Sequence, residues 1–304
     1  MRRYLAQRKY EVSLATRSNE FGPLRLFGFF MNDCDVASVR MTDIIRFYDL
    51  HGIYELDQNT TSHRGVKLKG FFRFALDEGE RLLFNPERIP IPPREFRMPD
   101  PATDEEFIAL MNAIPKTKKP VHVRNRAVLL MMRRGGLRVG EAVSLKSETI
   151  DTVKKQGIVQ TEKKRSGTPF DVFSWDDLTN DAIIEWLKIR NAIPKDRIKS
   201  DNLFLSLAGK TYGQAMVDNT IRVAMLLYCR KAGIRDLHPH CLRHAFALEF
   251  SMGGASGIEL KAMTRHKNVS STDPYTFFHG EHKRQTYDKF IVDKGPLDPL
   301  AALR

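Results

Sequence analysis

The sequence predicts a mainly α-helical protein with a small antiparallel β-sheet, an α+β fold arranged in two domains. Three observations lead to this prediction. Apolar residues recur three and four positions apart in most segments on both sides of residue 85. Segment 157–173 instead alternates and is partly β-branched, which is typical of strands. Between the helical regions, residues 85–104 contain six prolines, which lack a backbone donor and disfavour helix.

The first domain, 1–88, is expected to be a small helical bundle. Its helices are predicted by their apolar spacing at residues 24–31, 41–50 and 66–76. Ser38, Thr42 and the pair Thr61-Ser62 are candidate helix starts, because hydroxyl side chains can accept from free backbone N–H groups. The aromatic run Phe71, Phe72 and Phe74 suits either core packing or stacking against nucleic-acid bases, and we favour core packing.

The second domain, 104–304, follows a proline-rich linker at 89–103. Its helices are predicted at residues 104–114, 126–134, 181–193, 219–232 and 242–251. Gly135-Gly136 is expected to end the second of these helices. Segment 157–173 is expected to form a β-hairpin that turns at Ser166-Gly167.

The composition favours a nucleic-acid partner and a cytoplasmic location. Lys and Arg number 49 against 37 Asp and Glu, a formal net charge of +12 with a pI near 9.6. Such an excess favours a polyanion, because neutralised phosphates release their counterions. The apolar runs are too short for a membrane helix, and the basic start lacks the apolar run of a secretory signal. The three cysteines have no paired spacing, which favours a reducing cytoplasm over a disulfide framework.

The segment GLRVGEAVSL, residues 136–145, contains the first candidate phosphate ligand. Arg138 is expected on a turn between two helices, anchored by the apolar neighbours Leu137 and Val139. A guanidinium held there presents a planar set of donors that suits a phosphate, although a plain surface arginine fits the segment alone equally well. Glu141 is expected either to orient Arg138 by a charged hydrogen bond or to cap the next helix.

The segment HPHCLRHAFALEF, residues 238–250, contains the second candidate group. Pro239 precedes an amphipathic run, so His240 is expected to begin a helix with Arg243 one turn along it. Side chains three residues apart share a helix face, which lets an imidazole and a guanidinium reach one anion. The backbone donors of the helix start favour the same anion.

A metal site is the alternative interpretation of this histidine-rich segment. His238, His240, Cys241 and His244 are close in sequence, and His240 and His244 are four residues apart. However, Cys241 would face away from the two histidines, and no further ligand pair with suitable spacing occurs elsewhere. We therefore expect no metal and favour a structural role for His244.

The segment TRHKNVSSTDPYTFF, residues 264–278, contains a candidate nucleophile. Thr272-Asp273-Pro274 is typical of a turn, so Tyr275 is expected just after a bend. A phenol attacks poorly at its usual pKa near 10, but nearby cations favour the phenolate and the charge that develops on a phosphate. His266, nine residues earlier, is a candidate donor. Taken alone, a tyrosine after proline is more often a core residue.

Together these three segments resemble the tyrosine recombinase/integrase family. GLRVGEAVSL resembles its first arginine box, HPHCLRHAFA its His-x-x-Arg box, and RHKNVSSTDPYTF its final His-to-Tyr segment. The resemblance covers residues 104–289 and extends more weakly to 71–86. It implies a helical core-binding domain that contacts DNA, at 1–88, and a tyrosine-recombinase catalytic domain at 104–304. No long basic stretch precedes the first domain, which suggests the simpler two-domain type.

The resemblance implies a mechanism for cutting and rejoining DNA. Tyr275 would attack a phosphodiester, form a 3′-phosphotyrosyl link and release a 5′-hydroxyl. Arg138 and Arg243 would clamp the non-bridging oxygens, His240 would act as general base or proton relay, and His266 would donate a hydrogen bond to the phosphate. Because the covalent link conserves the ester energy, the reaction would need neither ATP, a metal nor another cofactor.

The family also uses a lysine on a β-hairpin to protonate the leaving 5′-oxygen. Here Lys163, Lys164 and Arg165 are consecutive in the predicted hairpin, and we assign this role to Lys164. The alignment can shift by one or two positions, and a basic turn that contacts DNA nonspecifically is the alternative.

Two further positions depart from the family's pattern or offer an alternative to it. Arg265 stands where the family commonly has glycine before the last histidine. The extra charge is expected either to touch DNA or to mark a different local turn. Tyr287 is the alternative nucleophile.

The expected partner is a double-stranded DNA recombination site. The resemblance implies a C-shaped clamp around the duplex and a homo-tetramer on two sites, and it leaves room for an accessory DNA-binding protein. The end of the chain, 281–304, is expected to dock on a neighbouring protomer. Alternatives are a type IB topoisomerase, a telomere resolvase and a catalytically silent DNA-binding regulator. A metal-dependent nuclease would need clustered carboxylates near the histidines, which the sequence lacks.

Overall fold

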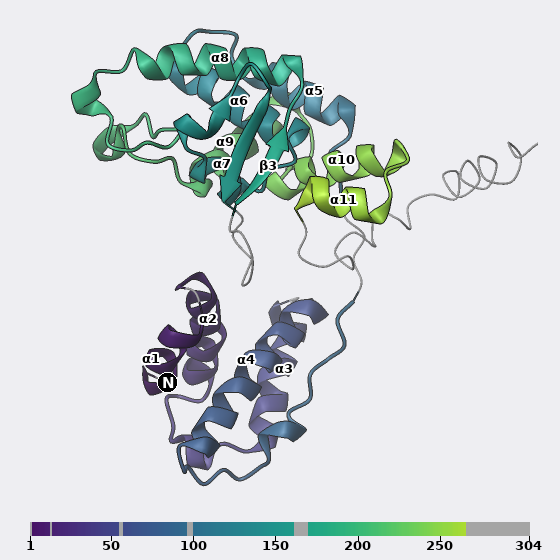
Figure 1. The fold of residues 1–304 in the computed structure, drawn as a ribbon. Helices are drawn as coiled ribbons and strands as arrows, with labels where there is room; N and C mark the ends of the chain where they lie inside the picture. Colours follow the sequence, from purple (N-terminus) through teal and green to yellow (C-terminus); the bar gives the residue numbers. More distant parts are fainter. Residues whose placement is uncertain (1, 13, 55–56, 96–99, 161–169, 266–304) are drawn as a thin grey trace, which may run out of the picture. The chain divides into compact units, whose positions relative to one another are not determined.

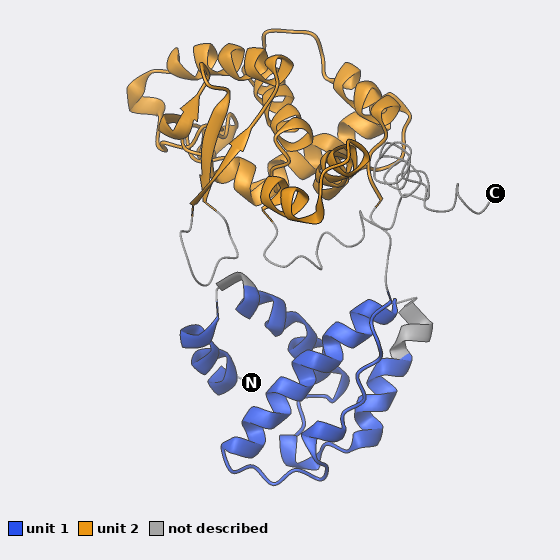
Figure 2. Ribbon diagram, turned by 45° about the vertical axis from the view of Figure 1, so that its right-hand side comes forward, with its two compact units in different colours: residues 1–97 blue, residues 98–304 orange. Residues whose placement is uncertain are grey.

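The computed structural model describes residues 2–12, 14–54, 57–95, 100–160 and 170–265 of the chain. The chain divides into two compact units, residues 1–97 and 98–304 (Figure 2). This division falls inside the segment 89–103 that the sequence marks as a linker. The DNA-contacting role assigned to the first unit stays a prediction.

The first unit consists of α-helices in its described part. They are α1 (Arg2–Glu11), α2 (Leu14–Phe30), α3 (Met41–Tyr54) and α4 (Gln58–Asp77), with short 3-10 turns at Val36–Ser38 and Pro86–Arg88. Helix α1 was not predicted, because it is strongly polar and buries only Tyr4. The predicted start of α4 at Thr61-Ser62 was wrong. Asp57 caps that helix instead, and its carboxylate accepts from the Thr60 N–H at 2.9 Å.

Aromatic side chains form the core of this unit. The ring of Phe27 lies 5.2 Å from that of Phe47 and 6.0 Å from that of Phe72, in both cases edge to face. Phe72 is fully buried, whereas Val66, at the start of the predicted helical segment 66–76, is exposed. Core packing is therefore confirmed for Phe72.

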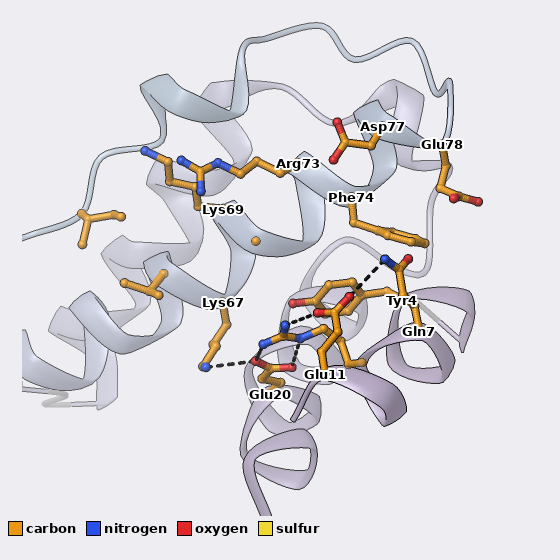
Figure 3. Close-up of a pocket in the computed structure, with 14 residues that line it drawn as sticks. Tyr4, Gln7, Glu11, Glu20, Lys67, Lys69, Arg73, Phe74, Asp77 and Glu78 are labelled. Atoms are coloured by element: carbon orange, nitrogen blue, oxygen red, sulfur yellow. Dashed lines mark hydrogen bonds and ion pairs between the residues drawn. The ribbon is translucent and has the colours of Figure 1, made fainter. Parts of the chain in front are cut away.

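A buried carboxylate holds the polar helix α1 against its neighbours (Figure 3). Glu20 of α2 is only 1% exposed and accepts from Arg8 of α1 at 2.7 and 3.0 Å. Lys67 of α4 donates to the same carboxylate at 3.2 Å. This triad lines a groove of about 610 Å³. Two cations, Arg8 and Lys67, balance the buried charge of Glu20. The ion pair with Arg8 thereby holds α1 in place, a helix that has little apolar surface of its own.

The second unit is built around α6, a largely buried helix (Figure 1). Its described helices are α5 (Asp104–Ala113), α6 (Pro120–Arg134), α7 (Val139–Ser144), α8 (Asp177–Asn191), α9 (Asp218–Ala232), α10 (Pro239–Met252) and α11 (Gly257–Thr264). Helix α6 begins six residues before its predicted start, and α11 was not predicted. None of the helices in the described ranges is long and apolar enough to cross a membrane.

A small antiparallel sheet completes this unit and confirms the predicted α+β class. Its described strands are β1 (Ile150–Asp151), β2 (Gln156–Gln160) and β3 (Phe170–Ser174), in the order β1-β2-β3. Gly157 pairs with Phe173 and Gln160 with Phe170, so β2 and β3 form the predicted hairpin. The two-residue strand β1 is too short to show an alternating pattern. The tip, residues 161–169, lies outside the described residues.

Candidate active site

A glycine turn between α6 and α7 presents the first candidate arginine. Gly135 ends α6, as predicted, and Gly136 follows with a φ of +60°, a backbone angle that favours glycine. A Cβ atom on Gly136 would lie 2.4 Å from the ring of Phe246 in α10, so the close approach of the two segments also requires glycine. Arg138 then occupies the N-cap position of α7. The turn thus brings Arg138 next to α10.

The fully buried side chain of Glu141 both orients Arg138 and caps α7. Its Oε1 atom accepts from Nη1 of Arg138 at 2.5 Å, and its Oε2 atom accepts from the Arg138 backbone N–H at 2.9 Å. The sequence left these two roles as alternatives, and the structure combines them. A charged hydrogen bond of this kind fixes the direction of the guanidinium.

The second candidate arginine, Arg243 of α10, reaches the same turn. It is buried and donates through Nη1 to the Gly136 carbonyl at 2.5 Å and through Nη2 to the Thr264 carbonyl. Its Nη1 also lies 3.5 Å from Oε2 of Glu141. Arg138 and Arg243, 105 positions apart in the sequence, therefore converge on one carboxylate.

A third arginine belongs to this cluster, and the sequence reasoning missed its place. Arg265 is buried and donates through Nη2 to the Gly136 carbonyl at 2.6 Å, with Oε2 of Glu141 at 3.4 Å. The expectation that it touches DNA was wrong for this conformation, because its side chain is only 2% exposed. Its left-handed backbone is the one that glycine commonly adopts at a helix end, so the alternative, a different local turn, stays a prediction. The signal that could have found it was a charged residue at a position commonly occupied by glycine.

The cluster carries an excess of positive charge. Burial raises the pKa of Glu141, but Arg265, Arg138 and Arg243 outweigh burial and hold that pKa below its usual range. Three guanidinium groups thus share one carboxylate. A buried cluster with such an excess is suited to a phosphate, whose oxygens accept from guanidinium donors.

His240 lies in the first turn of α10, where the sequence placed it. Pro239 takes the first helical position after His238, and His240 is exposed to solvent. Partial desolvation lowers the pKa of His240, and so does electrostatic repulsion from His238, Arg243 and Arg138. The imidazole is therefore neutral at pH 7 and able to accept a proton.

His244 lies one turn further along α10, with its ring centroid 6.1 Å from that of His240. Cys241 is buried in the core, in agreement with its expected direction away from the histidines. Within the described ranges, no group of three or more His, Cys, Asp or Glu residues is placed to hold a metal ion. The metal alternative therefore has no site among these residues.

Replacing His244 with glutamine is expected to make the protein less sensitive to mild acid. Burial lowers the pKa of His244 to about 4, from 6.5 in the unfolded chain, so the folded state resists protonation. The stabilisation from the neutral imidazole is complete above pH 6.5 and is lost as the pH falls towards 4. Urea unfolding at several pH values checks this. An equal loss of unfolding free energy in the wild type and in His244→Gln between these pH values would contradict it.

The remaining candidates, His266, Tyr275, Lys163, Lys164, Arg165 and Tyr287, lie outside the described residues. The described chain nevertheless leads to them from the cluster. Arg265 directly precedes His266 in the sequence, and its carbonyl accepts from Nη2 of Arg138 at 3.4 Å. Strands β2 and β3 flank the segment that contains the three basic hairpin residues.

Comparison with known proteins identifies the family. Residues 102–281 match the model of the phage integrase family. The tyrosine recombinase XerC of Listeria monocytogenes is 26% identical over 294 residues, 93% of each chain. XerC of Haemophilus influenzae is 27% identical over 237 residues, 77% of this chain and 75% of the relative.

Solved structures share the fold. The XerH site-specific recombinase bound to its palindromic difH substrate aligns with a TM-score of 0.72 at 18% identity, covering 92% of this chain and 81% of XerH. The Tn1549 transposon integrase in complex with a circular intermediate DNA also aligns with a TM-score of 0.72, at 17% identity, covering 94% and 98%. The family match spans more than half of the sequence and includes the whole arginine cluster, so this chain belongs to the phage integrase family.

Proposed function

We propose that the protein is a tyrosine site-specific recombinase, which cuts and rejoins DNA strands through a 3′-phosphotyrosyl intermediate. One observation carries this proposal: Arg138 and Arg243 converge on Glu141 beside the backbone that leads into His266 and Tyr275. Phosphoryl transfer to a tyrosine requires positive charge at the phosphate oxygens, which this cluster can supply, and Tyr275 follows Arg265 by ten residues in the sequence.

Each residue has a defined role in the proposed reaction. Tyr275 attacks the phosphorus, its phenolic proton passes to His240, and the 5′-oxygen of the next nucleotide leaves with a proton from Lys164. Arg138 and Arg243 neutralise the charge that builds on the non-bridging oxygens, and His266 donates a further hydrogen bond. Rejoining is the same sequence in reverse, with a 5′-hydroxyl as the nucleophile. The energy of the broken ester is kept in the tyrosyl link.

The partner of this reaction is a double-stranded DNA recombination site. The related XerH and Tn1549 integrase structures contain DNA, and the net charge of +12 suits such a partner. We further propose that residues 1–88 form the core-binding domain, that residues 104–304 form the catalytic domain, and that four protomers assemble on two sites. The enzyme acts in the cytoplasm, where its three cysteines stay reduced.

Tyr275→Phe is expected to abolish the covalent protein–DNA adduct and leave DNA binding nearly unchanged, because the substitution removes only the attacking oxygen. The measurement uses a nicked suicide duplex from the native flanking sequence, in which the released fragment diffuses away and the adduct accumulates. Denaturing gels count the adduct, and mass spectrometry of the digested complex identifies the residue that carries the 3′-phosphate.

Tyr287→Phe is the matched control, since it removes the same atom from the alternative nucleophile. It should form the adduct at the rate of the wild type. An adduct that survives Tyr275→Phe but is lost in Tyr287→Phe would move the nucleophile. An adduct that survives both changes would refute the assignment of the nucleophile to this segment.

A further inference from the structure

The position of Arg265 is one at which the backbone favours glycine. Arg265 ends α11 with φ +53° and ψ +41°, in the left-handed region, and its N–H donates to the carbonyl of Ala262 at 3.1 Å. Side chains with a Cβ atom are strained there, and glycine is the usual residue at such a helix end. Local structure therefore gives no reason for an arginine, and the reason must lie in what its side chain contacts.

The guanidinium of Arg265 is buried at a considerable cost in hydration. Its Nη1 donates to the Met263 carbonyl at 3.0 Å, and its Nη2 donates to the Gly136 carbonyl at 2.6 Å. Its Nε is buried without an acceptor among the residues that the structure describes. A buried charge with an unused donor is unfavourable unless a counter-charge stabilises it. Glu141 supplies that charge at 3.4 Å.

Arg265 shares its acceptors with the two arginines proposed to hold the phosphate. The Gly136 carbonyl accepts from both Arg265 and Arg243, and Glu141 accepts from Arg138 as well as from Arg265. The Arg265 guanidinium also lies 5.9 Å from the ring centroid of Phe173 in β3. One side chain thus contacts the arginine turn, the end of α11 and a strand of the hairpin.

We infer that Arg265 is a positioning residue for the cleavage of the DNA strand. The Arg265 guanidinium shares the acceptors Glu141 and Gly136 with the other two arginines. With Arg265 present, three guanidinium groups face one carboxylate, so two positive charges stay unbalanced; without Arg265, only one does. Arg138 and Arg243 therefore attract the phosphate more strongly when Arg265 is present. Arg265 also fixes the backbone directly before His266. This inference rests on the proposed recombinase function and adds to it a residue that acts through Glu141 rather than by touching DNA.

Cleavage of the suicide duplex at saturating DNA tests the inference, with the dissociation constant for DNA measured separately. We expect Arg265→Gly to lower the cleavage rate by about ten- to a hundredfold, by analogy with the loss of a side chain that orients a metal ligand. The dissociation constant should change by less than about threefold, because the side chain is buried. Glycine removes the backbone strain, so this variant is expected to fold. Arg265→Lys keeps the charge but loses the planar guanidinium, so its cleavage rate should lie between those of the wild type and Arg265→Gly.

Two further measurements separate positioning from a purely structural role. Added ethylguanidinium should restore part of the cleavage rate of Arg265→Gly, since it can occupy the emptied space beside Glu141. The exposed Arg230 of α9 is the matched control, and Arg230→Gly should cleave at the wild-type rate. Wild-type cleavage by folded Arg265→Gly would overturn the inference. Failure of the wild type itself to form an adduct would instead refute the proposed function, and the inference with it.

Discussion

Arg138→Ala is expected to slow cleavage of the suicide duplex by about 100- to 1,000-fold, the usual effect of removing one preorganised donor from a developing anion. The guanidinium of Arg138 is held by Glu141 at 2.5 Å but keeps 18% of its side-chain surface exposed, so a phosphate can reach it. The rate constant for single-turnover cleavage at saturating DNA is the measurement, since it excludes effects on binding.

Arg138→Lys separates the charge from the geometry at this position. Lysine retains one positive charge but cannot hold Glu141 and a phosphate oxygen with the same planar group. We expect a rate between those of the wild type and Arg138→Ala, with DNA affinity in a mobility-shift assay nearly equal for all three proteins. Normal cleavage by Arg138→Ala would contradict the proposed phosphate clamp.

Glu141→Gln is expected to reduce the free energy of unfolding by about 3 to 5 kcal/mol, because it leaves a buried group of charges without its partner. Glu141 is fully buried and is the carboxylate shared by Arg138, Arg243 and Arg265. Glutamine has nearly the same shape, so the loss reports the charge rather than a cavity. Urea unfolding at pH 7 measures it.

The exposed Glu148 provides the matched control for this substitution. Glu148→Gln should change the unfolding free energy by less than about 0.5 kcal/mol, as is usual at the surface. The pH dependence gives a second check. Because the pKa of Glu141 is lowered in the folded state, its stabilisation is present above about 4.5 and is lost as the pH falls towards the folded value. The Glu141→Gln variant should lack this component; a stability equal to that of the wild type at pH 7 would refute the role of Glu141.

Local chemistry was enough to predict much of the fold. Helix α5 begins at Asp104 as expected, because Thr103 and Glu106 form a reciprocal cap that is visible in the sequence. Helix α9 was placed within one residue by its apolar spacing. In contrast, α1 is held by the pairing of Arg8 with Glu20, and no periodicity records a partner on another helix. For this reason the apolar spacing did not predict α1.

The candidate site likewise has one part that could be predicted from the sequence and one part that could not. The order of its segments and the chemistry of Arg138, His240 and Arg243 could be predicted, since each segment carries its own residue pattern. The position of Arg265 could not, because nothing near it in the sequence predicts that a left-handed helix end directs a charged side chain into the protein.

By itself, the sequence determined the helical class, the hairpin, the family and the residues with the chemistry to hold a phosphate. Only the tertiary structure decided that three arginines share Glu141 and that Gly136 must be glycine. The physical reason is the separation along the sequence over which each effect acts. Helix periodicity and capping act over a few residues, whereas the balance of a buried charge depends on groups that the chain brings together from more than a hundred positions apart.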